Sequence, residues 1–358
     1  MKGHHLEELK EIEMTPHPIA DLPSGPPGRS GWPWTAARVS SFPARMPEGS
    51  LWPSISIVTP SFNQGPFLEE TIRSILLQGY PHLEYIVIDG GSTDETPDVL
   101  KKYEAWLTYW VSEPDQGQAA AINKGLRRAT GQIVAFLNSD DTYQPDTLAT
   151  VAGAFMSQPR LRWLCGRCAY VDEHGKELSI QQPKIPRSPA EWILRPLGLV
   201  DYAFPQPAVF LRNEFRLELG PFREDYAYCF DHDYWLRALL TGHGPSALDY
   251  HLANFRVHPG SKTGSLTHGF QAEDLAIADR YSDRLRSRER KQLLRFRGLL
   301  QTMAIVTDCA ALAETQGAKA ARRKLWGKVR ENPALLSYRA VWGAFRRWYG
   351  IHPEAGPA

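Results

Sequence analysis

The most constraining feature of this chain is an alternation of strand-like and helix-like segments that begins at residue 54. Short apolar runs rich in β-branched residues alternate with segments whose apolar residues have helical spacing, such as Ile72, Ile75 and Leu76. Strands that alternate with helices predict βαβ units and a parallel sheet, and nearly continuous apolar strands indicate helices on both faces. The expected strands are SISIVTP, LEYIVID, LTYWVSE and GQIVAFLN.

Three further regions differ from this regular part in pattern. Residues 1–50 are rich in proline and glycine and predict an irregular, partly disordered leader. Residues 156–270 predict a mixed continuation, with a hairpin in RWLCGRCAYVD and HGKELS, a helix in DHDYWLRALLTG and a strand in LDYHLANFRVH. Residues 271–358 are basic and have a helical pattern.

Composition excludes several classes of protein. A net charge of +1 does not indicate nucleic-acid binding. The sequence contains no run of eighteen apolar residues, so we expect no transmembrane helix. The first residues lack the apolar core of a signal peptide. Four cysteines in 358 residues predict reduced thiols in the cytoplasm. Cys165 and Cys168 form a CxxC pattern, but no second cysteine or histidine pair follows as a zinc site requires.

Polar residues follow all four predicted strands, and three of the four ends carry carboxylates. In an open parallel sheet, ligands bind at the carboxyl ends of the strands. Asp94 can be explained as a helix cap, but three acidic ends at one edge exceed what capping requires. Such an edge suits a metal ion and a ligand rich in hydroxyl and N–H donors. The four ends contain Asn63, Asp89, Asp115 and the pair Asp140–Asp141.

The motifs at these ends, in their order and spacing, resemble those of the family 2 glycosyltransferases. The resemblance spans residues 54–265 and includes SIVTPSFNQGPFLEETIRSILLQGYPHLEYIVIDGGSTDET, SEPDQGQAAAINKG, FLNSDD, QPAVFLRNEFRLELGPFRED and FRVHPGSKT. It implies an α/β protein of the GT-A type, with a mixed, mainly parallel sheet flanked by helices and a helical C-terminal appendage. The catalytic domain would be 51–270, with a nucleotide-sugar half (51–155) and an acceptor half (156–270), followed by the helical region 271–358.

The resemblance also implies a reaction, the transfer of a sugar from a nucleotide diphosphate sugar to a hydroxyl, usually with inversion. Asp89 would accept a hydrogen bond from the base, which favours a UDP- or dTDP-sugar. Asn123 and Lys124 would orient the loop after the third strand, or simply lie on a helix surface. The residues expected at the donor are Pro60, Ser61, Asn63, Asp89, Asp115, Gly117, Asn123, Lys124, Asn138 and Ser139.

Asn138-Ser139-Asp140 occupies the place of the family's DxD motif, which binds Mg²⁺ or Mn²⁺. A divalent cation stabilises the charge that develops on the leaving diphosphate, and hard cations prefer oxygen ligands. We therefore expect Asp140 to be the direct ligand, with Asn138 on the donor or the metal shell. Asp141 would support it or cap a helix. His258 is a further ligand candidate, and Ser261 and Lys262 follow it on a loop that could close over phosphate.

An inverting transfer needs a general base for the acceptor hydroxyl. Asp231 aligns with the aspartate of the family's ED motif, although Phe230 replaces the glutamate. Asp233 is the alternative, and because the two lie about 200° apart on a helix, only one can face the cleft. Gln206 and Pro207 would line the acceptor side.

Three other functions are compatible with an α/β chain of this kind. A nucleotide-dependent oxidoreductase would need a GxGxxG turn after the first strand, and a sugar nucleotidyltransferase would need a glycine-rich basic loop there; TPSFNQGPF is neither. A non-catalytic sugar- or partner-binding module of the same fold remains the alternative, because Asn138 and Phe230 depart from the family pattern.

The basic, tryptophan-containing C-terminal segments allow two interpretations. Amphipathic helices of this kind can lie on an anionic membrane surface, or their apolar stripe can pack on the protein. Contact with a membrane surface would fit a glycan or lipid-linked acceptor, and hence polysaccharide or cell-envelope glycan synthesis. The enzyme would then be cytoplasmic and peripheral at the inner face of the membrane.

Overall fold

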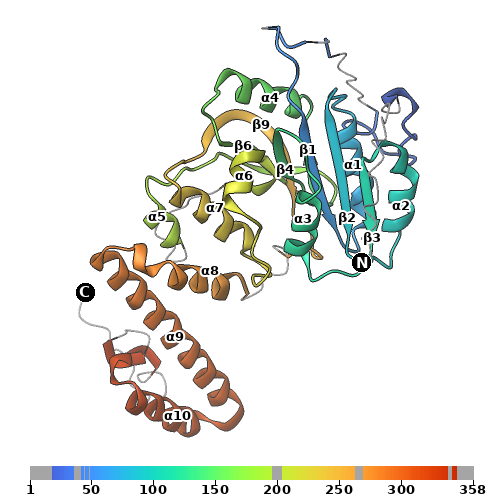
Figure 1. Cartoon of the computed structure of the whole chain (residues 1–358). Coiled ribbons are helices and arrows are strands. Elements are labelled where there is room, and N and C mark those ends of the chain that lie inside the picture. Colours follow the sequence, from blue (N-terminus) through green and yellow to red (C-terminus); the bar gives the residue numbers. More distant parts are fainter. Residues whose placement is uncertain are drawn as a thin grey trace, which may run out of the picture. The chain divides into compact units, whose positions relative to one another are not determined.

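The structure is a computed structural model that describes residues 18–35, 42–43, 45–47, 49–195, 204–262, 269–337 and 341–344. These residues form two compact units. One takes its described residues from the ranges 1–187 and 202–273, and the other from 188–201 and 274–358. The first unit contains the sheet, and the second contains the long C-terminal helices (Figure 1).

The first half of the sheet is parallel, as the alternation of segments predicted. Its strands lie in the order β3-β2-β1-β4, and each neighbouring pair is parallel. Every residue of β1 is buried, as expected for a strand between two helical layers. The strands are β1 (Ile55–Ser61), β2 (Leu83–Asp89), β3 (Tyr109–Ser112) and β4 (Ile133–Phe136).

The connecting helices are short and pack through one apolar face. Ile72 and Ile75 are fully buried and Leu76 is 3% exposed, which confirms the face predicted from their spacing. Gly125 allows its helix to approach the sheet closely, because a Cβ there would overlap the side chain of Val58. The helices are α1 (Gly65–Leu76), α2 (Thr96–Tyr103), α3 (Gln118–Leu126) and α4 (Thr147–Ser157).

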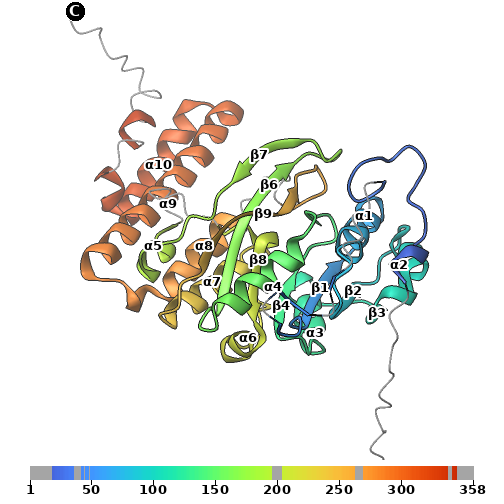
Figure 2. The same cartoon turned by 90° about the horizontal axis from the view of Figure 1, so that it is seen from above.

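The second half makes the sheet mixed, which confirms the predicted fold class. The order continues through β8, β6, β9 and β5, and β7 pairs with β6 outside this path. The predicted hairpin is present, since β6 and β7 are antiparallel, and β6 also pairs in parallel with β9 (Figure 2). These strands are β5 (Thr142–Tyr143), β6 (Trp163–Val171), β7 (Glu177–Gln181), β8 (Val209–Arg212) and β9 (Ser246–Arg256).

The remaining helices include the predicted C-terminal ones. They are α5 (Pro189–Ile193), α6 (Asn213–Leu219), α7 (Phe230–Leu240), α8 (Gly269–Arg280), α9 (Ser287–Gln316) and α10 (Ala318–Glu331). Short 3₁₀ turns occur at Ile19–Asp21, Glu104–Trp106, Gln206–Ala208, Ser282–Arg284 and Pro333–Ser337. In the part of the chain that the structure describes, every helix is too short or too polar to cross a bilayer.

The described leader residues 18–35 are largely irregular but lie on the first unit. Arg73 of α1 is buried and donates hydrogen bonds to the carbonyl oxygens of Pro23 and Pro33, at 2.5 and 3.1 Å. Trp32 donates from its indole to the Tyr143 carbonyl at 2.8 Å. The leader is thus held by its backbone carbonyls, a contact that composition could not predict. Residues 42–43, 45–47 and 49–50 of the leader are also described, and Met46 among them is buried. The remaining leader residues lie outside the described part of the chain.

Cys165 and Cys168 lie on β6 as buried free thiols. The pairing of β6 with β9 shifts register between Arg167 and Cys168, so simple alternation does not hold there. Burial raises the pKa of both thiols well above the ordinary value, which disfavours the thiolate that metal binding needs.

Candidate active site

The structure brings the polar strand ends to one edge of the sheet. In the parallel register Ser61 lies beside Asp89, and Asp89 lies beside Ser112. On the other side of β1, the amide of Leu137 donates to the Val58 carbonyl, which places Asn138 next along the same edge. The convergence follows from the parallel order of the strands, because their carboxyl ends then face one way.

Asp89 is 0% exposed and already accepts three hydrogen bonds from the protein. Ser92 donates its amide and its hydroxyl, at 2.9 and 2.5 Å, and the Ser112 hydroxyl donates at 2.6 Å. A carboxylate offers about four acceptor positions, and the protein itself fills three of those of Asp89. Nearby, the Ser61 hydroxyl is buried without a hydrogen-bond partner among the described residues. An unpartnered buried hydroxyl at this edge is a position where a bound ligand would restore a hydrogen bond.

The turn after β1 contains a residue with a left-handed backbone conformation. Asn63 has a φ of 51°, accepts a hydrogen bond from the Thr93 amide at 2.9 Å, and donates its own amide to the Ser92 hydroxyl at 2.7 Å. These bonds join the loops after β1 and β2, so the αL conformation of Asn63 is compensated. Pro60 lies buried within β1 one position before Ser61.

The loop after β3 is folded back on the end of β2. Asp115 accepts a hydrogen bond from the Gly117 amide at 2.7 Å, and Gly117 has a φ of 110°, which favours glycine. A Cβ at Gly90 would stand 3.0 Å from the Asp115 carboxylate, so only a glycine leaves this carboxylate its full space. Lys124 forms an ion pair with Glu113 and thereby helps orient this loop.

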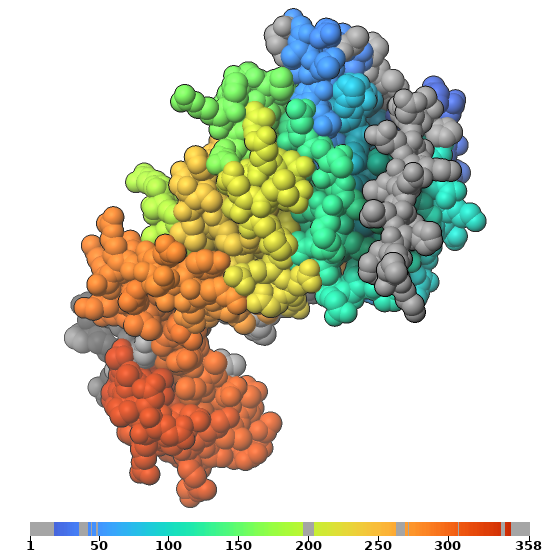
Figure 3. Space-filling model, in the orientation of Figure 1, coloured from blue at the N-terminus to red at the C-terminus, as the bar shows by residue number. Residues whose placement is uncertain are grey.

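Asn123, which was expected at the donor, is buried and its amide is engaged within the protein. It is 3% exposed, accepts a hydrogen bond from the Phe222 amide and donates to the Phe222 carbonyl and to Glu224. Both ends of its amide are therefore occupied by the loop before α7. Figure 3 shows the yellow surface of this part of the chain lying against the green surface that includes α3.

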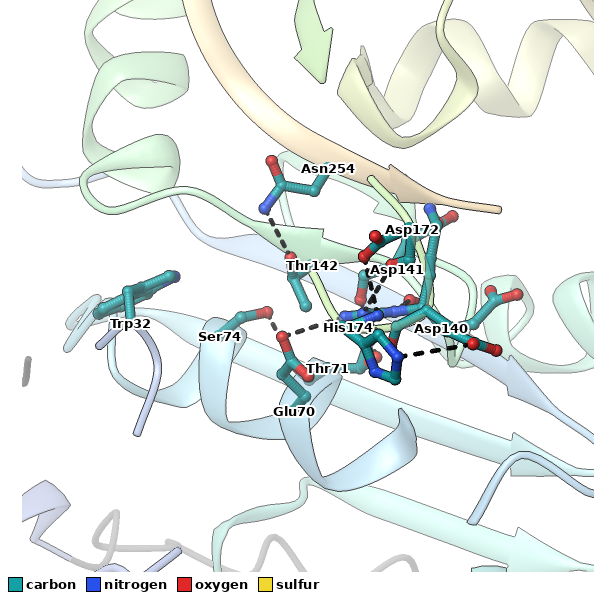
Figure 4. Close-up of polar contacts among 12 residues, drawn as sticks. Trp32, Glu70, Thr71, Ser74, Asp140, Asp141, Thr142, Asp172, His174 and Asn254 are labelled. Atoms are coloured by element: carbon teal, nitrogen blue, oxygen red, sulfur yellow. Dashed lines mark hydrogen bonds and ion pairs between the residues drawn. The ribbon is translucent and has the colours of Figure 1, made fainter. Parts of the chain in front are cut away.

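The acid turn, residues 138–141, connects β4 with β5 and is hydrogen-bonded to α1. The Thr71 hydroxyl bonds to the carbonyl oxygens of Ser139 and Asp141, at 2.9 and 2.7 Å (Figure 4). Ser139 is buried, and Asp141 is 1% exposed. Burial, and then the charge of Asp140, raise the pKa of Asp141 well above its ordinary value. Asp141 is therefore a structural partner of the turn, as one of the two sequence interpretations held.

Asp140 is the more accessible carboxylate of the pair. Among the described residues it contacts His258, whose Nε2 lies 3.1 Å from Asp140 Oδ2. The His258 ring also packs on Phe67, with centroids 4.5 Å apart. Two ligands at adjacent positions of an octahedral Mg²⁺ or Mn²⁺ would be separated by about 3 Å, so this pair fits such an ion.

Asn138 is used differently from what its place in the motif suggested. Its Oδ1 accepts from Gln118 at 2.7 Å, and its Nδ2 donates to Asp141 and Gln206 at 3.2 and 3.1 Å. Both ends of the amide are thus engaged, which argues against Asn138 as a metal ligand. Gln206 also donates to the Phe136 carbonyl at 2.8 Å, and Pro207 beside it is buried.

Gln118 is a residue that the sequence analysis missed. It connects Asn138 to Lys262, whose ammonium donates to Gln118 Oε1 at 2.9 Å and to the Ala227 carbonyl at 2.6 Å. Burial lowers the pKa of Lys262, and the charges of Asp231, at the start of α7, and of Glu273 act in the opposite direction. The acid turn is therefore linked to the segment before α7 through the side chains of Gln118, the first residue of α3, and Lys262. The available signal was position, because Gln118 directly follows the glycine of the third strand end.

The two aspartates of α7 have different environments. Asp233 is 0% exposed and pairs with Arg237 and Arg223, at 2.9 and 3.5 Å. The Asp231 side chain is 20% exposed, and its carboxylate accepts a hydrogen bond from the His232 amide at 2.8 Å. Asp233 is therefore engaged within the protein, whereas Asp231 keeps part of its side chain exposed. Phe230 is buried against Phe136 and Phe222, so the glutamate position of the motif is part of the aromatic core.

Comparison with known proteins identifies the class of protein to which this fold and edge belong. The sequence model of Glycosyl transferase family 2 matches residues 56–203. An uncharacterized glycosyltransferase of Mycobacterium tuberculosis is 31% identical over 191 residues, which are 53% of this chain and 70% of the relative. The chain therefore belongs to the family 2 glycosyltransferases, a family of sugar-transferring enzymes, as its motifs predicted.

Two more particular similarities are informative. TuaG of Bacillus subtilis, whose name assigns it to teichuronic acid biosynthesis, is 43% identical over 99 residues, 27% of this chain and 39% of TuaG. The structure of S. aureus TarS 1–349 in complex with UDP-GlcNAc matches with a TM-score of 0.51 and 19% identity, over 82% of this chain and 92% of that one. The second similarity confirms the GT-A type of fold.

Proposed function

We propose that the protein transfers a sugar from a UDP- or dTDP-sugar to a hydroxyl of a cell-envelope glycan or lipid-linked acceptor, with inversion at the anomeric carbon. The observation that carries the proposal is the single edge at which the acid turn, the Asp140–His258 pair and the start of α7 are linked. TuaG, which is named for teichuronic acid biosynthesis, supports the cell-envelope assignment, and TarS, which was solved with UDP-GlcNAc, supports a UDP-sugar donor.

In this proposal the donor lies along the ends of β1 to β4. Asp89 has one acceptor position left for the N–H of a pyrimidine base, and the unpartnered Ser61 hydroxyl lies beside it. Asp115 and Gly117 face the ribose or the sugar, where the missing side chain of glycine permits close approach. The neighbouring loops are fixed by Asn63 and by the Lys124–Glu113 pair.

Asp140 and His258 would hold a divalent cation, Mg²⁺ or Mn²⁺, at the donor diphosphate. A bound cation of this kind would supply Lewis-acid stabilisation of the charge on the leaving nucleoside diphosphate. Asp140 is suited to this role because it retains accessible oxygen atoms, whereas Asp141 is buried and bonded to the turn.

Asp231 would accept the proton of the acceptor hydroxyl as that oxygen attacks the anomeric carbon. Gln206 and Pro207 would lie on the acceptor side of the acid turn. The alternative is a binding module without activity, favoured by Asn138 and by Phe230, which is a core residue here. The two differ in whether nucleoside diphosphate is released from the donor.

The test is a thermal-shift titration with UDP and Mn²⁺, followed by an assay for UDP release from UDP-sugars. We expect the wild type to be stabilised by UDP only when Mn²⁺ is present, by about 2.7 kcal/mol at a hundredfold excess over Kd. Asp140→Ala should lose this metal-dependent part, and Asp141→Asn should keep most of it. Metal-dependent stabilisation that survives in Asp140→Ala would contradict the assigned site, and binding without any turnover would favour the non-catalytic module.

The C-terminal unit offers a surface for the membrane contact. On α10, Lys319, Arg323, Trp326 and Arg330 are all exposed and follow each other at spacings that place them on one face. Among the described residues none of these three cations forms an ion pair, whereas Lys324 and Lys328 on other faces pair with Asp308 and Glu331. An exposed tryptophan among unpaired cations suits an anionic lipid surface, and would place the enzyme at the inner face of the membrane.

A further inference from the structure

The side chain of Arg256 is enclosed by three segments that are far apart in the sequence. Arg256 ends β9 and is 2% exposed. Its Nη2 lies 3.0 Å from Glu70 Oε1, and its Nε donates to the Asp140 carbonyl at 2.9 Å. Its Nη1 donates to the carbonyl oxygens of Asp172 and Glu173, at 3.3 and 3.2 Å. Figure 4 shows Glu70, Asp140 and Asp172 gathered around this point.

The main chain of Arg256 contacts the same turn a second time. Its amide donates to Asp141 Oδ1 at 2.9 Å, just beyond the antiparallel pairing of Thr142 with Asn254. Asp140 is thus held through its carbonyl by the guanidinium, and Asp141 through its carboxylate by the backbone. The acid turn is bracketed by one residue.

The chemistry of the contacts explains why an arginine stands here. A buried cation costs several kcal/mol unless it is paired and fully hydrogen-bonded. Arg256 has one acidic partner, Glu70, and otherwise bonds to neutral carbonyl oxygens on two different turns. The planar guanidinium can donate in several fixed directions at once, which the single ammonium of a lysine cannot do over the same span.

His258 makes the placement relevant to the site. It lies two residues after Arg256, and its Nε2 is 3.1 Å from Asp140 Oδ2. Arg256 fixes the backbone of Asp140 on one side and the end of β9, from which His258 extends, on the other. The spacing of the two side chains that face the donor therefore depends on Arg256.

We propose that Arg256, together with Glu70, is a positioning residue that sets the separation of Asp140 and His258 for the divalent cation of the donor diphosphate. The inference rests on the proposed function, because the cation and the diphosphate belong to it. Arg256 itself is 2% exposed and is therefore shielded from a ligand bound at the edge. It acts through the backbone of Asp140 and the end of β9.

The test compares Arg256→Lys with Arg212→Lys, a matched control. Arg212 also ends a strand and donates its guanidinium to carbonyl oxygens, those of Leu161 and Phe155, but lies on β8 away from the acid turn. Two measurements are made on each protein: hydrogen–deuterium exchange of the peptide 137–143 without ligand, and the Mn²⁺ concentration that half-saturates UDP binding.

We expect Arg256→Lys to exchange faster in peptide 137–143 and to need about ten- to a hundredfold more Mn²⁺, the usual effect of losing a residue that orients a metal ligand. Arg212→Lys should lower the thermal midpoint without changing either quantity. Unchanged exchange or an unchanged Mn²⁺ requirement in Arg256→Lys would overturn the inference. If wild type and variant both bind UDP without any Mn²⁺ dependence, the proposed metal site fails, and with it the role assigned to Arg256.

Discussion

At the scale of single residues, neighbouring carboxylates of this protein differ in what surrounds them. Asp140 and Asp141 are adjacent in sequence, yet one is accessible and meets His258 while the other is buried and bonded to a backbone amide. Burial and the nearby charge of Asp140 raise the pKa of Asp141, so the two cannot serve the same purpose. Asp231 and Asp233 are divided by burial in the same way.

The α7 aspartates give a prediction in which activity and stability separate. Asp231→Asn should lower sugar transfer by about 10² to 10⁴, the usual contribution of a general base, with little change in stability. Asp233→Asn should instead lower the free energy of unfolding by about 3 kcal/mol, because it leaves Arg237 and Arg223 without their buried partner. Initial transfer rates and urea unfolding curves measure the two effects. A large loss of transfer in folded Asp233→Asn, with Asp231→Asn active, would reverse the assignment.

At the scale of secondary-structure elements, the catalytic edge is fixed by helices that lie outside it. Thr71 of α1 bonds to two carbonyl oxygens of the acid turn. Glu273 of α8 accepts the amides of Ala227, Tyr228 and Cys229, each at 2.8 Å, immediately before α7 begins. A carboxylate at a helix N-terminus is favoured by the helix dipole, so α8 stabilises the start of the helix that carries Asp231.

Removal of the Glu273 carboxylate should therefore affect the site by disturbing the start of α7, which carries Asp231. Glu273→Ala leaves three amides without their acceptor, and we expect a loss of about 1.5–3 kcal/mol in the free energy of unfolding. Transfer should fall further than UDP binding, because Asp231 loses its position while the donor edge is unchanged. Urea unfolding, UDP affinity and initial rates test this, with Glu289→Ala of α9 as the control; equal losses in UDP affinity and rate would contradict it.

At the scale of the whole molecule, the leader and the C-terminal helices lie outside the motifs of the family, and the structure shows how parts of each are arranged. The leader lies over α1, where Arg73 binds its carbonyl oxygens. The C-terminal unit carries the face of α10 that contains Lys319, Arg323, Trp326 and Arg330. The physical distinction is that the leader is held by buried hydrogen bonds, whereas that face has exposed cations that remain unpaired among the described residues.

The membrane proposal predicts a difference between two variants of equal charge. Arg323→Gln/Arg330→Gln should weaken binding to phosphatidylglycerol-containing vesicles about thirtyfold, since each basic residue near an anionic surface contributes about 1 kcal/mol. Lys324→Gln/Lys328→Gln removes the same charge from ion-paired positions and should have a smaller effect. Co-sedimentation with anionic and neutral vesicles measures this. Equal effects, or no preference for anionic vesicles in the wild type, would reject the surface.

The sequence by itself determined the alternation of strands and helices, the family and the edge of the sheet at which the chemistry should lie. It could do so because apolar periodicity and the order of short motifs are local properties, and because parallel strands necessarily end on one side. Asp140, Asp231 and His258 were selected on the same grounds.

Only the tertiary structure decided which polar residues at that edge are free for a ligand and which are used by the fold. Asn123 and Asn138 were expected at the donor, but both amides are occupied by partners from distant segments. No local sequence pattern indicates the roles of four further residues, because their contacts join loops and helices far apart in the chain. These residues are Glu70, Gln118, Arg256 and Glu273. Burial and hydrogen-bond partners depend on which distant segments meet, and that is set by packing rather than by local sequence.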